Sequence, residues 1–237
     1  MVYNWLKNIQ LQCLPHFCAV CQQNTGTNRA ICNDCYNTLK FNTYSCNSCA
    51  IPLPETNTVM TCGQCLKKTP DFDQATSLFR YETPVRQLIH SLKFNRKLAL
   101  SDLLGQLMAE DLHSRQVIRP ECIIPVPLSN KRLRERGFNQ SLELARPISR
   151  LLDVPVDWRL VSRVRDTDTQ TRLDLKARRK NVKDAFSIRK NKKYQYVAIL
   201  DDVMTTGATC NELARCLKKS GIKQVDVWCL ARAEKGA

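Results

Sequence analysis

The sequence lacks any hydrophobic run that could cross a membrane, because no stretch approaches the roughly 18 consecutive apolar residues that a spanning helix needs. Its start, Met1 to Pro15, also lacks the apolar core and the cleavage pattern of a secretory leader. These absences predict a cytoplasmic protein without a membrane span. The length of 237 residues suits one moderate domain with a small additional module.

Acidic residues are few relative to basic ones, with 22 Asp and Glu against 37 Lys and Arg and a formal net charge of +15. The excess is concentrated between Arg115 and Lys193, where 21 basic residues face 9 acidic ones. Such a basic field is suited to polyphosphate or nucleic acid. A solvated basic face would give the same counts, so the motifs must decide between the two.

Cysteine is abundant, and its spacing indicates metal binding. Eight of the 13 cysteines form four C-x2-C pairs, whereas the other five show no such pairing. Unpaired thiols fit a reducing compartment, where this spacing is typical of zinc sites and a disulfide or redox role is the weaker alternative. Two pairs complete one four-cysteine zinc site, so the sequence predicts two zinc ions. The expected ligands are Cys18, Cys21, Cys32, Cys35, Cys46, Cys49, Cys62 and Cys65.

The pairing of these four knuckles is not fixed by their spacing. We favour sequential pairing, first with second and third with fourth, as two zinc ribbons; interleaved pairing stays open. The stretch from Cys18 to Cys65 has few large apolar residues, so its folding is expected to depend on metal. The expected division is a double zinc-ribbon module over residues 1–70 and a second domain over residues 71–237.

One stretch near the C-terminus predicts a strand, a polar turn and a helix. Tyr196 to Leu200 is a short apolar run, and apolar residues recur at helical spacing from Leu213 to Leu217. The turn between them is rich in Thr and contains a Gly, so it can offer backbone N–H groups to a phosphate. Asp201 and Asp202 would repel that phosphate and are expected to accept hydrogen bonds from hydroxyl groups, or to hold a metal ion. A ribose 5-phosphate fits both features, and a plain Thr-capped helix is the alternative.

A second candidate anion site follows the apolar stretch Cys122 to Leu128. There, four cations surround Gly137 just after a predicted strand that ends in prolines. These cations are Lys131, Arg132, Arg134 and Arg136.

The remaining elements are read from apolar spacing. Strands are expected at 75–81 and 225–230, and helices at 85–92, 100–108 and 142–148. Pro147 should kink or end the last of these helices. Lys93 and Arg96 are candidates to face a ligand, although cations also favour helix C-termini for dipole reasons. The charged block from Arg163 to Arg178 has no buried period, so by itself it indicates a loop.

The Asp201 to Thr209 string, two acids, two hydrophobic residues and Thr-Thr-Gly-x-Thr, closely resembles the signature of type I phosphoribosyltransferases. The resemblance implies an α/β fold with a Rossmann-like, mostly parallel sheet flanked by helices. It also implies that Asp201 and Asp202 face the ribose of phosphoribosyl pyrophosphate (PRPP), which binds with Mg²⁺. The residues implied to wrap the 5-phosphate are Thr205, Thr206, Gly207, Ala208 and Thr209.

Two further blocks, Val126-Pro-Leu to Arg136-Gly-Phe-Asn-Gln and the Thr/Gln/Arg pattern after it, resemble the ComF family of competence and DNA-utilisation proteins. In that fold the first block is the pyrophosphate loop, and the second is a flexible loop over the pyrophosphate. The implied pyrophosphate-loop residues are Ser129, Lys131, Arg132 and Arg136. The implied flexible-loop residues are Arg163, Arg165, Thr167, Gln170 and Arg178.

The resemblance implies a PRPP-binding protein that handles incoming single-stranded DNA, with a helicase or another DNA-processing protein as a possible partner. Basic residues and zinc modules can both grip a phosphate backbone. The alternative is a metabolic phosphoribosyltransferase that transfers ribose 5-phosphate from PRPP to a nucleobase. No base pocket is recognisable in the sequence, so a nucleobase acceptor is implied by the family resemblance alone. The sequence also leaves open whether the chain is catalytically active.

Overall fold

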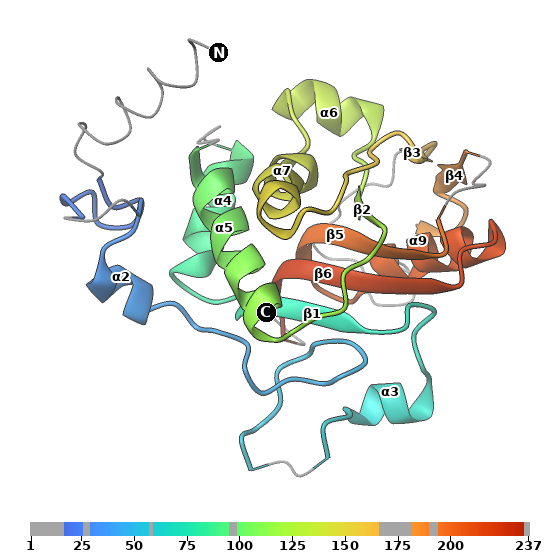
Figure 1. The fold of residues 1–237 in the computed structure, drawn as a ribbon, viewed down its shortest axis with the longest axis horizontal. Coiled ribbons are helices and arrows are strands. Elements are labelled where there is room, and N and C mark those ends of the chain that lie inside the picture. Colours follow the sequence, from blue (N-terminus) through green and yellow to red (C-terminus); the bar gives the residue numbers. More distant parts are fainter. Residues whose placement is uncertain are drawn as a thin grey trace.

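A computed structural model describes residues 17–25, 29–56, 59–94, 99–165, 182–189 and 194–234. Its centre is a four-stranded parallel sheet with the strand order β1-β6-β5-β2 (Figure 1). The strands are β1 (Ala75–Arg80), β2 (Cys122–Pro125), β3 (Val161–Arg163), β4 (Phe186–Ile188), β5 (Tyr196–Met204) and β6 (Gln224–Arg232). The helices are α2 (Asn33–Asn37), α3 (Gly63–Lys67), α4 (Val85–Phe94), α5 (Ala99–Ser114), α6 (Asn130–Arg136), α7 (Gln140–Leu152) and α9 (Ala208–Lys219).

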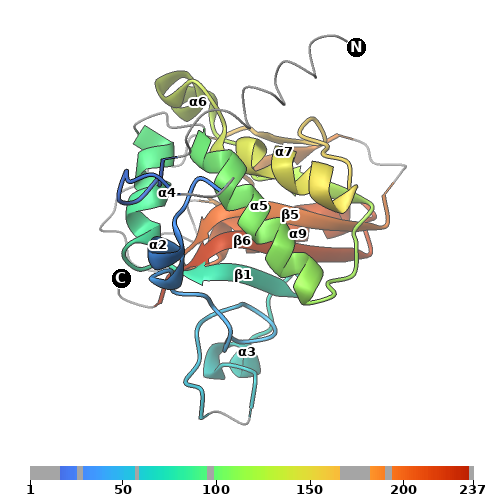
Figure 2. The ribbon, with the colours of Figure 1, turned by 60° about the vertical axis from the view of Figure 1, so that its left-hand side comes forward.

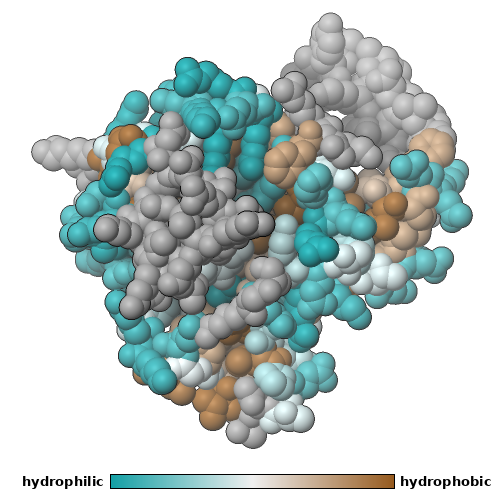
Figure 3. Space-filling model, turned by 180° about the vertical axis from the view of Figure 1, so that it is seen from behind, coloured by the Kyte–Doolittle hydropathy of each residue, from teal (hydrophilic) through white to brown (hydrophobic). Residues whose placement is uncertain are grey.

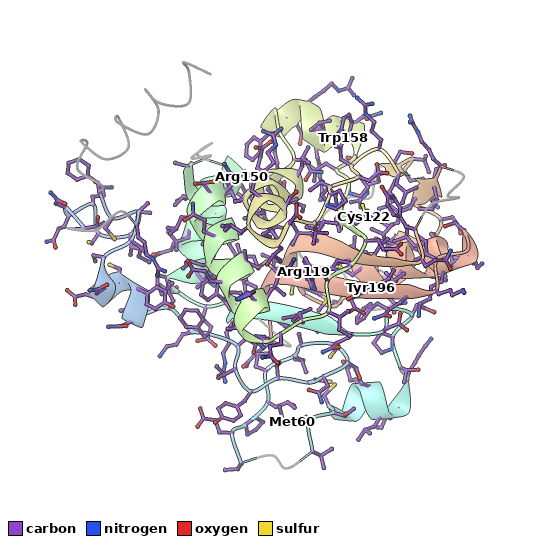
Figure 4. The ribbon with its side chains drawn as sticks, viewed as in Figure 1. Met60, Arg119, Cys122, Arg150, Trp158 and Tyr196 are labelled. Carbon is purple, nitrogen blue, oxygen red and sulfur yellow. The ribbon has the colours of Figure 1, made fainter. Side chains whose placement is uncertain are left out.

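The central strands are almost continuously apolar because both faces of the sheet are covered. Along β5, Ala198 and Leu200 belong to one buried cluster, whereas Val197 and Ile199 belong to the other. This alternation is the period of two that a strand imposes. Cys122 and Tyr196, labelled in Figure 4, lie where the neighbouring strands β2 and β5 begin.

Helices α4, α5 and α7 cover one face of the sheet (Figure 2). Helix α9 covers the other face, together with a two-stranded antiparallel sheet of β3 and β4. No helix among the described residues is long and apolar enough to span a membrane.

Helix α7 does not end at Pro147, which was one of the two outcomes that the sequence predicted there; a kink stays a prediction. One helix runs from Gln140 to Leu152 with Pro147 inside it. The proline ring packs closely on Gly105 of α5, where an added Cβ would lie 2.3 Å from the Pro147 Cγ. The glycine therefore gives the ring room within the contact between the two helices.

The cysteine-rich module is joined to the domain by backbone pairing and by shared core. Phe41 pairs with Phe79 of β1 in an antiparallel bridge, and the Asn42 N–H donates to the Leu78 carbonyl. Ile31 and Leu39 are buried in the same cluster as the helices over the sheet. In the view from behind, hydrophobic residues gather at the lower end of the molecule, over the second half of the module (Figure 3).

Two boundaries differ from those expected. The strand β5 runs on through both acids to Met204, so Asp201 and Asp202 are strand residues and not turn residues. Arg163 lies in β3 and not in a loop, because Val161 to Arg163 pairs with β4. A strand of three residues in a charged stretch is too short to show the alternation of apolar and polar residues by which a strand is recognised in a sequence.

Candidate functional site

The eight C-x2-C cysteines form two separate groups of four. Within each group the sulfur atoms lie within 4.8 Å of one another. The Sγ atoms of Cys21 and Cys32 are 3.8 Å apart, and those of Cys49 and Cys62 are 3.7 Å apart. Four thiolates at about 2.3 Å around a tetrahedral zinc ion are separated by about 3.8 Å, so the geometry fits zinc. The groups are Cys18, Cys21, Cys32 and Cys35, and Cys46, Cys49, Cys62 and Cys65, which confirms sequential pairing.

Backbone amides support the thiolates of each group. The N–H of Val20 donates to the Cys18 sulfur at 3.4 Å, and the Cys62 N–H donates to the Cys46 sulfur at 3.3 Å. Burial opposes ionisation of Cys18, but backbone hydrogen bonds outweigh it and lower its pKa to about 6. Burial raises the pKa of Cys35 and of Cys65, and hydrogen bonds to the neighbouring thiols of each group add to the rise.

The turn between β5 and α9 has the backbone form of an anion-binding loop. Gly207 adopts the left-handed conformation with φ of +75° and precedes the first residue of α9. The Thr206 Oγ1 accepts a hydrogen bond from the Ala208 N–H at 3.2 Å. Thr205 is exposed, whereas Thr206 to Thr209 are half-buried. The first N–H groups of a helix have no partner within the helix, so this loop, residues 205–209, can bind a phosphate.

The two acids point to opposite faces of the sheet. Asp201 lies on the α9 side, where its Oδ2 is 3.8 Å from the Cys210 sulfur. Asp202 is buried on the α4 side and forms an ion pair with Lys93. Neighbouring residues of a strand alternate, so the two carboxylates leave β5 on different sides, and their placement around one ribose stays a prediction.

The environments of the two acids separate their pKa values. Burial raises the pKa of Asp201, and the neighbouring Asp202 carboxylate adds to the rise. Burial also acts against the charged form of Asp202, but the Lys93 ammonium prevails and lowers its pKa. The pair therefore carries one firmly ionised carboxylate, at Asp202.

The predicted pyrophosphate segment in α6 and the phosphate loop follow β2 and β5, which are neighbouring parallel strands of the sheet. Ser129 caps α6 by accepting a hydrogen bond from the Arg132 N–H. Lys131 is exposed. Arg136 already has partners within the protein. Its guanidinium donates a hydrogen bond to the Gln140 side chain at 2.9 Å and lies 5.4 Å from the Phe94 ring centre.

Of the predicted flexible-loop residues, two are described. Arg163 lies in β3, 5.8 Å from the Phe186 ring centre, and the Arg165 guanidinium donates to the Lys183 carbonyl at 3.2 Å. Thr167, Gln170 and Arg178 lie outside the described residues, as does Arg96.

Sequence reasoning missed Arg232, the last residue of β6. Its guanidinium is buried and donates to backbone carbonyls of both the phosphate loop and the second cysteine group. A groove of about 620 Å³ lies beside it, lined by residues of the second cysteine group, the phosphate loop and α9. No sequence signal points to this role, because the partners of Arg232 are remote along the chain.

Comparison with known families supports both halves of this description. Residues 11–66 match the double zinc ribbon domain, and residues 139–237 match the phosphoribosyl transferase domain. Among solved structures, a purine phosphoribosyltransferase from Pyrococcus horikoshii covers 67% of this chain and 78% of its own, with 20% identity and a TM-score of 0.32.

Full-length relatives also match. The chain is 36% identical over 234 residues to the DNA utilization protein YhgH of Escherichia coli, covering 96% of both chains. It is 37% identical over 224 residues to competence protein F of Haemophilus influenzae, covering 91% of this chain and 96% of the relative. With competence protein ComFC of Bacillus subtilis, identity is 25% over 152 residues, or 62% of this chain and 59% of that one. The chain therefore belongs to the ComF family, in which a double zinc ribbon precedes a type I phosphoribosyltransferase domain.

Proposed function

We propose that this protein binds PRPP, or a related phosphoribosyl ligand, at the carboxyl edge of its parallel sheet and acts in DNA utilisation in contact with single-stranded DNA. The observation that supports the ligand most directly is the phosphate loop at residues 205–209, with left-handed Gly207 at the start of α9. The cations of α6 follow the neighbouring strand β2, so a second anionic group of the same ligand has a partner at that edge.

The ligand is expected to place its 5-phosphate on the loop N–H groups and its pyrophosphate towards Lys131 and Arg132. Its ribose would lie over the end of β5. Lys93 pairs with Asp202 Oδ2, so a ribose hydroxyl that donates to this carboxylate would lie beside the Lys93 ammonium, and Lys93 becomes part of the proposed site. Asp202 is paired with Lys93, and the raised pKa of Asp201 disfavours its charged form, so neither carboxylate is a strong Mg²⁺ ligand in this arrangement. We therefore expect Mg²⁺ to enter on the phosphates of PRPP.

The proposed role in DNA utilisation is supported by the relatives and by charge. The full-length relatives are called DNA utilization proteins and a competence protein. The net charge of +15 and its concentration between Arg115 and Lys193 favour a polyanionic partner. The affinity for a single-stranded oligonucleotide should fall steeply with salt. An affinity that does not change with salt, or no binding at low salt, would contradict the proposed contact with single-stranded DNA.

Calorimetric titration with Mg²⁺-PRPP tests the ligand. The wild-type chain should bind, and Thr206→Val should bind about tenfold more weakly, because the hydroxyl that shapes the loop is lost. Ser220→Ala is the matched control, since it removes a hydroxyl at the opposite end of α9 and should leave the affinity unchanged. Absence of heat with the wild-type chain would refute the proposal.

A screen of acceptors decides whether binding leads to turnover. Release of pyrophosphate from PRPP with a purine, pyrimidine or pyridine base would favour the metabolic phosphoribosyltransferase. PRPP binding without release, in the presence of every acceptor, would favour a role in which the ligand regulates the handling of DNA.

A further inference from the structure

One buried guanidinium joins the second cysteine group to the phosphate loop. The Arg232 Nε donates to the carbonyl of Cys49 at 2.9 Å. Its Nη1 donates to the carbonyls of Met204 at 2.9 Å and Ala233 at 3.0 Å, and also to that of Thr205. Cys49 is a member of the second cysteine group, and Thr205 is the first residue of the phosphate loop.

The burial of Arg232 requires this set of contacts. The residue is 5% exposed, and a buried charge is costly unless it is paired or fully hydrogen-bonded. Among the described residues, no carboxylate forms an ion pair with it. Four backbone carbonyls hold the charge instead, and four thiolates around a divalent ion would carry a net charge of about −2 beside it. When zinc is bound, the thiolates of the second cysteine group therefore carry a counter-charge to Arg232 that four neutral thiols do not carry.

The carbonyls that Arg232 bonds belong to segments far apart along the chain, the second cysteine group and the end of β5 with the phosphate loop. The knuckle from Cys46 to Cys49 is tied to the end of β6 by Arg232, and the buried Ala50 that follows it packs in the cluster over the α9 face of the sheet. The groove of about 620 Å³ separates the rest of the second cysteine group from the loop and α9. If the knuckle loses zinc and shifts, Arg232 loses one anchor and the loop loses a donor that fixes its first carbonyls.

We propose that Arg232 is a positioning residue that couples the second zinc centre to the phosphate loop. Zinc at Cys46, Cys49, Cys62 and Cys65 then favours the loop geometry that binds a phosphorylated ligand, and a bound ligand slows the loss of that zinc. The coupling is reciprocal by thermodynamic necessity. The ligand half of this inference rests on the proposed phosphoribosyl site, whereas the metal half does not.

The test follows zinc loss from each group separately. The zinc-loaded full chain is challenged with a chelator, and the thiols that become exposed are alkylated and quantified residue by residue by mass spectrometry. Ribose 5-phosphate is the ligand probe because it needs no Mg²⁺. In the wild-type chain it should slow labelling of Cys49 and Cys62 about tenfold and leave Cys21 and Cys35 unchanged.

Arg232→Lys keeps the charge but loses the fork that reaches several carbonyls at once. Without ligand it should label Cys49 about 10-fold to 100-fold faster than the wild type, the range seen when outer-shell partners of metal ligands are removed. Protection by ribose 5-phosphate should disappear. Arg29→Lys is the matched control, because Arg29 lies between knuckles of the first group and pairs on the surface with Glu110 at 3.1 Å; its labelling pattern should equal the wild type.

The failures are distinguishable. If titration shows that ribose 5-phosphate binds the wild-type chain but leaves Cys49 labelling unchanged, the coupling is overturned while the phosphate site stands. If ribose 5-phosphate and PRPP both fail to bind, the proposed function fails, and the coupling of ligand to zinc fails with it. If circular dichroism shows that Arg232→Lys is unfolded, the test is the wild-type chain alone: ribose 5-phosphate must slow the labelling of Cys49, and unchanged labelling overturns the coupling.

Discussion

Replacing Lys93 with methionine tests the electrostatics of the site. The side chain of Lys93 is 18% exposed and that of Asp202 is 5% exposed, so the ion pair is largely removed from water. Methionine keeps the length of the side chain but leaves the Asp202 carboxylate buried without its partner. Breaking a buried pair in this way costs about 3–5 kcal/mol of unfolding free energy, and the partial exposure of Lys93 favours the lower end.

Urea unfolding of the zinc-loaded chain at pH 7 measures this loss. Lys93→Met with Asp202→Asn should recover most of it, because no orphan charge remains. The loss in the single variant should shrink as the pH falls, since a buried acid without a partner has a raised pKa and becomes neutral. Lys218→Met is the control: its pair with Asp73 is 33% and 42% exposed and should contribute at most about 1 kcal/mol.

Two results would refute this reasoning. One is a loss below about 1 kcal/mol for Lys93→Met, which would mean that water screens the pair as it screens surface pairs. The other is a double variant no more stable than the single one, which would mean that the lost stability does not come from an unpaired carboxylate.

Further perturbations test other features. Gly105→Ala should lower the unfolding free energy by about 1–3 kcal/mol despite the better helix propensity of alanine, because the new Cβ would meet the Pro147 ring; an unchanged urea midpoint would contradict the packing. Gly207→Ala should cost about 1–2 kcal/mol, since its φ is +75°, and should weaken ribose 5-phosphate binding in calorimetry; equal affinity would mean that the loop does not hold the phosphate. The raised pKa of Asp201 means that its contribution to stability is complete below its unfolded pKa, near pH 4, and is lost as the pH rises to about 7; Asp201→Asn should remove this slope, and identical slopes would argue against burial of the acid. Elemental analysis of the purified chain should find two zinc ions, and one ion would show that only one group binds.

Local patterns in the sequence predicted much of the site. The spacing of the C-x2-C pairs predicted two metal centres, and the structure confirms the favoured sequential pairing. The strand, turn and helix around the Thr-rich loop were predicted because all their signals lie within one short stretch. Each signal of this kind depends on neighbours in the chain, which a sequence shows directly.

What the sequence could not give depends on contacts between remote residues. Asp202 meets Lys93 only because α4 packs on the face to which Asp202 points, and a pair of adjacent acids does not reveal how far the strand continues. Arg232 and Cys49 are 183 positions apart, so their hydrogen bond follows from the assembled fold alone. The continuation of α7 past Pro147 was missed for a similar reason, because the room that its ring occupies is provided by Gly105 of another helix.

The pairing of residues 40–42 with β1 has a consequence for solubility. β1 is an outer strand of the sheet, and open strand edges tend to pair with other chains. The Phe41 bridge and the hydrogen bond from the Arg80 N–H to the Lys40 carbonyl occupy that edge. Removing the cysteine module would therefore expose the backbone edge of β1 to other chains. We expect the shortened chain to aggregate more readily than the full chain.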